Sequence, residues 1–79
     1  MSEEIWHFVV DILGPDLKWR DPVTGTLDLE SGNLNTHGEL LPTEISDELR
    51  QFEPGVHEGN QWSVNVGQFV HRIRFDKLN

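Results

Sequence analysis

Histidines are the side chains of this chain best suited to holding a metal ion or moving protons near neutral pH. The sequence has four of them, spread along its length: His7, His37, His57 and His71. None belongs to a His-x-His, His-x-x-x-His or glutamate-paired pattern of the kind that binds zinc. We therefore expect no metal and no cofactor. A small metal-dependent enzyme stays an alternative only if His7 and His71 meet in the folded chain.

Carboxylates are the other groups that could do chemistry, but their spacing does not favour catalysis. Acid–base hydrolysis needs two carboxylates held in a cleft, whereas the acids here are spread along expected turns and one helix flank. The window from Asp28 to Glu39 has the length of a calcium loop, yet its glycine, Gly32, is displaced from the central position. No nucleophile elbow, phosphate loop or dinucleotide fingerprint occurs. We predict that the chain is not an enzyme.

The charge is strongly acidic and unevenly distributed. The chain has 14 acidic and 6 basic residues, which gives a formal net charge of -8. From Asp21 to Glu58 there is one base, Arg50, among nine acids, and the sign reverses near the end at Arg72, Arg74 and Lys77. Such a field repels nucleic acids and anionic membranes and attracts basic surfaces. The alternative is that acidity only keeps a small protein in solution.

Length and composition place limits on the architecture. The 79 residues predict a single compact domain, residues 1–79. The sequence has no cysteine, so packing alone must hold the fold. The N-terminus is acidic, and the apolar run that follows it ends at Asp11, which matches neither a signal peptide nor a membrane-spanning helix. We expect a cytoplasmic protein without membrane contact.

The first half of the chain predicts strands. Residues 5–13 are rich in β-branched and aromatic side chains, and their even positions are all apolar, which indicates a strand with one face in the core. Residues 17–29 are interpreted as a hairpin around the turn 21–25, because Pro22 and Gly25 suit a type I turn followed by a left-handed residue. A turn at 31–33 and a short third strand at 34–36 are expected next.

The segment from Thr43 to Phe52 predicts the single helix. Its apolar residues, Ile45, Leu49 and Phe52, recur at i, i+4 and i+7. Thr43 is the candidate N-cap, although Ser46 could cap instead and shorten the helix by about one turn. The helical repeat also gathers acids on one flank of the apolar stripe: Glu44, Asp47 and Glu48.

The C-terminal third predicts two strands whose apolar phase changes from even to odd positions across Gly67 and Gln68. A bulge centred on Gly67 or a tight corner would keep both apolar sets on one face. A helix over residues 66–73 is the competing interpretation. Trp6 and Trp62 are in phase with apolar neighbours and are assigned to the core. Trp19 is also assigned there, with an exposed binding anchor as the alternative.

These elements predict an α+β fold, a small antiparallel sheet of four to five strands with one short helix packed on a face. In its small size, its acidity and its lack of cysteine or catalytic motif, the chain resembles the small phage-encoded inhibitors, especially DNA-mimicking anti-CRISPR proteins. The resemblance lies in the composition of the whole chain. It implies that carboxylates stand where phosphates would lie, occupy a basic nucleic-acid groove and exclude the real ligand.

We therefore expect a binding inhibitor, monomeric, whose partner is the basic surface of a nucleic-acid-binding protein or complex, with no direct contact to nucleic acid. The expected contact residues are the acids of the helix and its flanking turns: Glu30, Glu39, Glu44, Asp47, Glu48, Glu53 and Glu58. The alternative is an accessory module that pairs with another subunit through an edge strand or an exposed Trp19. Steep salt dependence of binding would distinguish the first from the second.

Overall fold

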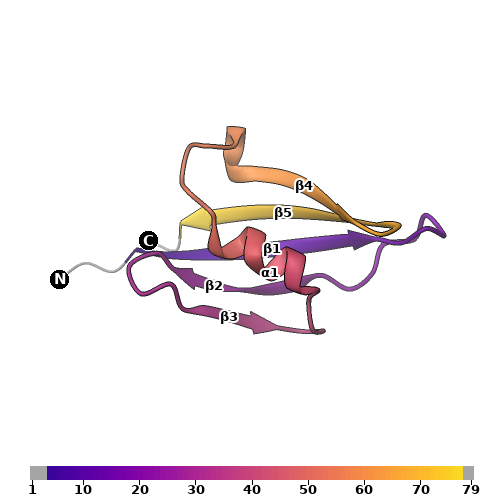
Figure 1. Cartoon of the computed structure of the whole chain (residues 1–79), viewed down its shortest axis with the longest axis horizontal. Helices are drawn as coiled ribbons and strands as arrows, with labels where there is room; N and C mark the ends of the chain where they lie inside the picture. The colour runs from indigo at the N-terminus through magenta and orange to yellow at the C-terminus, as the bar shows by residue number, and fades with distance from the viewer. Residues whose placement is uncertain (1–3, 78–79) are drawn as a thin grey trace.

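The computed structural model describes residues 4–77 and shows a five-stranded antiparallel sheet with one α-helix on a face (Figure 1). The elements in chain order are β1 (Ile5–Leu13), β2 (Val23–Asp28), β3 (Leu34–His37), α1 (Thr43–Arg50), the 3-10 helix η1 (Glu58–Asn60), β4 (Gln61–Val66) and β5 (Phe69–Lys77). The strand order across the sheet is β3-β2-β1-β5-β4. The α+β class predicted from the sequence is confirmed.

The two longest strands, β1 and β5, lie side by side at the centre of the sheet. Phe8 is paired with Phe75 and Val10 with Ile73, so apolar residues of both strands share one face. Phe8 and Val10 are fully buried, as the alternating pattern of residues 5–13 predicted. The helix α1 lies across this face (Figure 1), and its Ile45 and Leu49 are also fully buried.

The hairpin predicted over residues 17–29 is wrong. The chain reverses earlier, where the amide of Leu17 donates to the carbonyl of Gly14 at 3.0 Å. Residues 17–20 form no strand, and Trp19 makes only an isolated bridge to Leu13. The stretch predicted as the turn leads into β2, in which Gly25 pairs with Phe8 of β1.

Close packing explains why a glycine stands at position 25 in a strand. A Cβ there would overlap the backbone carbonyl oxygen of Asn35 and lie 2.6 Å from Cζ of Phe8. Glycine is the residue that lets a large side chain and a neighbouring backbone approach a strand this closely. Gly25 therefore serves packing, while Gly32, with a φ of 79°, serves the turn predicted at 31–33 before β3.

The helix is present where the sequence predicted it, but it begins differently. Pro42 precedes it at the N-cap position and no side chain of residues 4–77 caps it, so neither Thr43 nor Ser46 has the predicted role. Phe52 lies just beyond its last residue. The Phe52 ring stacks on Phe75 with ring centroids 3.9 Å apart, which joins the end of the helix to the sheet.

A two-residue turn connects β4 to β5 and accounts for the change of apolar phase. Val66 pairs with Phe69 across Gly67 and Gln68, and Gly67 has a φ of 60°. The tight corner is therefore correct, and both the bulge and the helix over residues 66–73 are wrong. Because of this register, the apolar residues at even positions of β4 and at odd positions of β5 lie on the face that α1 covers.

The opposite face of the sheet has no second layer among residues 4–77. Trp19 is 50% exposed, so its assignment to the core is wrong. The guanidinium of Arg72 lies over its ring, 4.8 Å from the centroid. Arg74 pairs with Asp76 of its own strand at 3.4 Å and not with an acid on a neighbouring strand. Within the described part of the chain, no helix has the length and apolarity needed to cross a membrane.

Candidate functional site

The outer flank of α1 carries the acids that the helical repeat predicted. Because Ile45 and Leu49 point at the sheet, Glu44 and Asp47 are turned toward solvent, and both are exposed. Asp47 has a cationic neighbour, Arg50, at 4.0 Å. Such an exposed pair is screened by water and contributes little. The helix therefore holds two accessible carboxylates on a rigid element.

Glu48 differs from its neighbours because it is tied to the sheet. Its Oε1 accepts a hydrogen bond of 3.0 Å from the indole Nε1 of Trp62 in β4, and its side chain is partly buried. The ring of His57 stacks on the indole of Trp62 with ring centroids 4.2 Å apart. Glu48 thus fixes α1 to β4. We assign it a structural role in addition to its charge.

The remaining predicted acids are distributed over three loops. Glu53 is exposed just after α1, and together with Glu48 it lines a cavity of about 270 Å³. Glu58 is exposed in η1. Glu30 and Glu39 flank opposite ends of β3. The structure therefore gathers four of the predicted acids on α1 and the loop after it, and it separates Glu30 from Glu39.

These acids have few cationic partners. The ion pairs within residues 4–77 join Arg20 to Asp16, Arg50 to Asp47 and Arg74 to Asp76. Asp47 is thus the only predicted contact residue with a cation within 4.0 Å in this part of the chain. The other carboxylates are not neutralised from inside the molecule, so their field acts on whatever approaches.

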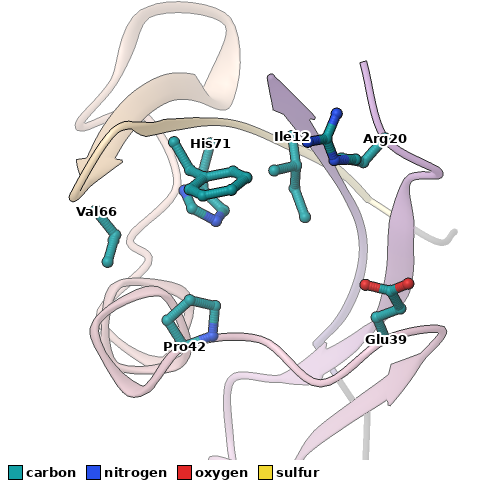
Figure 2. A pocket seen from close by; sticks show the side chains of 7 residues that line it. Ile12, Arg20, Glu39, Pro42, Val66 and His71 are labelled. Carbon is teal, nitrogen blue, oxygen red and sulfur yellow. The ribbon is translucent and has the colours of Figure 1, made fainter. Parts of the chain in front are cut away.

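A second cavity, of about 380 Å³, lies between the N-terminal end of α1 and the sheet (Figure 2). We call it the His71 cavity and define it by its lining residues: Ile12, Arg20, Glu39, Pro42, Val66, Phe69 and His71. Its walls are mostly apolar. Figure 2 shows Arg20 and Glu39 together on one side of it.

His71 is the buried polar residue of this cavity. Its side chain is 3% exposed, and its Nδ1 has no hydrogen-bond partner among the described residues. Burial lowers the pKa of His71 below the ordinary value of 6.5, although the backbone carbonyls of Val64 and Phe69 act in the opposite direction. The imidazole is therefore neutral near pH 7. Its place in the apolar phase of β5 was visible in the sequence, but the cavity beside it was not.

The histidines do not form a metal site in the described residues. His7 lies on the uncovered face of the sheet, where it pairs with Asp76, whereas His71 pairs with Ile12 and is buried on the face under α1. The convergence of His7 and His71 is therefore wrong. From residue 4 to residue 77, no group of three or more His, Asp or Glu side chains is arranged to hold a metal ion.

Comparison with models of protein families, with curated proteins and with solved structures finds no match to this chain.

Proposed function

We propose that this chain is a small acidic binding protein, without catalytic activity, that inhibits a nucleic-acid-binding protein or complex in the cytoplasm by occupying its basic groove. The observation that carries this proposal is the set of exposed carboxylates on α1 and the loop that follows it, chiefly Glu44 and Glu53, which have no cation within 4.0 Å among residues 4–77. A rigid helix packed on a sheet holds Glu44 in a fixed position, and Glu53 lies in the loop directly after that helix. This is what a mimic of a charged polymer requires.

The spacing of charge along α1 supports mimicry of a phosphate backbone. Glu44 and Asp47 are three residues apart, which corresponds to about 4.5 Å along a helix axis. Successive phosphates of one DNA strand rise by about 3.4 Å. The two charge densities are therefore comparable, and lysine or arginine side chains arranged for DNA would meet carboxylates at similar intervals. Electrostatic steering would make the association fast and strongly dependent on salt.

Charge reversal on this surface tests the proposal. The variant Glu44→Lys, Asp47→Lys, Glu53→Lys changes three exposed side chains and leaves Glu48, because Glu48 holds Trp62. A partner captured from a cell lysate with the wild-type chain, eluted by a salt gradient and purified, should bind DNA, and the wild-type chain should displace that DNA. The triple variant should neither bind the partner nor displace the DNA.

A matched control separates position from net charge. The variant Asp11→Lys, Asp21→Lys, Asp76→Lys also reverses three charges, and since each reversal adds 2, both triples carry -2 in place of -8. The control should keep binding. Equal loss in both triples would mean that net charge alone matters. Binding that is indifferent to salt between about 50 and 500 mM would contradict the proposal.

An accessory interaction module is the second candidate, and the exposure of Trp19 favours it. A tryptophan that is 50% exposed beside Arg72, on a sheet face without a second layer in residues 4–77, has the chemistry of an interface anchor. The unpaired outer edge of β4 could add a strand from a partner. In this case Trp19→Ala abolishes binding, while salt and the acidic triple have little effect.

A further inference from the structure

The His71 cavity has the size and the lining of a small-molecule site. Its volume of about 380 Å³ exceeds the cavity of roughly 150 Å³ that accommodates benzene in a protein core and lies at the lower end of ligand sites, which begin near 300 Å³. Ile12, Pro42 and Val66 supply apolar walls. An aromatic ring with one or two small substituents matches this space.

His71 adds one specific polar group to these apolar walls. Its Nδ1 is buried without a hydrogen-bond partner in the described part of the chain, and an unsatisfied buried nitrogen is unfavourable in either tautomer, since it lacks an acceptor when protonated and a donor when not. A hydroxyl group both donates and accepts. It can therefore satisfy the imidazole whichever tautomer is present, while a carbonyl or an ammonium group satisfies only one.

The charges at the side of the cavity select against anions. Arg20 is already bound to Asp16 at 3.1 Å, whereas Glu39 has no cation within 4.0 Å among residues 4–77. A ligand entering past Glu39 therefore meets a net negative charge. A neutral ligand avoids this repulsion.

We infer that the His71 cavity binds a neutral hydroxyaromatic group, whose ring packs against Ile12, Pro42 and Val66 and whose hydroxyl hydrogen-bonds to the imidazole of His71. Phe69 also lines the cavity, and because this residue is 38% exposed it has room to turn outward; the guanidinium of Arg20 lies 5.7 Å from its ring centroid. Because Nδ1 of His71 is itself buried, the hydroxyl reaches it only when part of this wall turns outward. The site does not depend on the proposed inhibitor function.

Titration of the full-length ¹⁵N-labelled chain with 4-methylphenol and, separately, with toluene tests this inference by NMR. We expect saturable shifts confined to residues around the cavity, and at least tenfold tighter binding of 4-methylphenol than of toluene. The imidazole nitrogens of His71 should respond to 4-methylphenol only. Absence of saturable shifts, equal affinity for the two probes, or an unchanged His71 imidazole would overturn the inference.

Two variants identify the residue that recognises the hydroxyl. His71→Phe keeps an aromatic ring in the core but removes both nitrogens, so it should still take toluene and should lose the tenfold preference for 4-methylphenol. His57→Phe, a histidine outside the cavity, should keep the preference. A preference that survives His71→Phe contradicts the assignment. The imidazole resonances of the wild-type chain decide the question independently if His71→Phe does not fold.

Further probes distinguish the source of the hydroxyaromatic group and its charge. N-acetyltyrosinamide that binds as well as 4-methylphenol points to a tyrosine of a partner protein, and its exclusion points to a free phenol. The anion 4-hydroxybenzoate should bind more weakly, and Glu39→Gln should reduce this difference. The triple variant of Glu44, Asp47 and Glu53 should bind 4-methylphenol like the wild type. The ligand site at His71 can therefore be tested even if the proposed inhibitor function is wrong.

Discussion

Replacement of Gly25 by alanine tests the most specific packing relationship in the fold. Gly25 lies in β2 between Phe8 of β1 and Thr36 of β3. An added Cβ would overlap the carbonyl oxygen of Asn35 and approach Phe8 Cζ to 2.6 Å, where real Cβ atoms stay beyond 3.0 Å. Phe8 is fully buried. The substitution must therefore displace β3, shift the Phe8 ring, or do both.

The expected loss of folding stability depends on which atoms the added Cβ would meet. Overpacking in a core costs about 1–3 kcal/mol, and a backbone carbonyl held in a sheet yields less than a side chain, so we expect about 3 kcal/mol. For 79 residues the whole free energy of unfolding is about 4–12 kcal/mol. Gly25→Ala thus removes at least a quarter of it, which corresponds to a fall in Tm of roughly 12–24 °C.

Urea unfolding followed by tryptophan fluorescence and by circular dichroism measures this loss. Gly67→Ala is the matched control, because Gly67 has a φ of 60° and, apart from its two chain neighbours, no described residue has an atom within 4 Å of an added Cβ. Its cost comes only from the left-handed backbone, about 1 kcal/mol. If Gly25→Ala costs no more than Gly67→Ala, the close approach of β1, β2 and β3 at this position is refuted.

Two further predictions concern an exposed aromatic residue and a buried titratable one. Trp19→Ala should cost less than about 1 kcal/mol in urea unfolding, because the ring is 50% exposed, while a loss of about 3–5 kcal/mol would be that of a buried tryptophan. Burial lowers the pKa of His71 in the folded chain below 6.5, so above that pH both states are neutral there. As the pH falls below 6.5 the unfolded chain takes up the proton first, and stability should decrease toward the folded pKa. His71→Phe should reduce this decrease when urea midpoints are compared from about pH 7.5 to pH 5; an unchanged pH profile would contradict the assignment.

Local periodicity was sufficient to predict the strand β1 and the helix. The alternation of Trp6, Phe8 and Val10 needs only a strand with one buried face, and the i, i+4 spacing of Ile45 and Leu49 needs only a helix beside a sheet. Both patterns are properties of consecutive residues. The surrounding fold had only to supply an apolar surface for each to cover.

The turn predicted at residues 21–25 is wrong because residues distant in the sequence decide the conformation there. Pro22 and Gly25 satisfy the requirements of a turn. In the folded chain, however, the ring of Phe8 and the carbonyl of Asn35 occupy the space where a Cβ of residue 25 would lie. The wrong position predicted for the turn also explains why the core assignment of Trp19 is wrong. As a hairpin residue it would have faced the core, whereas after the early reversal at Gly14 it lies beside Leu13 on the uncovered face.

The sequence by itself determined the acidity of this protein, the positions of Glu44 and Asp47 on a helix flank and the apolar phase of every long strand, because charge and periodicity are encoded in neighbouring residues. Only the tertiary structure decided that Glu48 is bound to Trp62, that Glu30 and Glu39 flank opposite ends of the strand β3, and that a cavity opens beside His71. These features arise where segments distant in the chain come together. Their geometry depends on register and packing, which no single stretch of sequence contains.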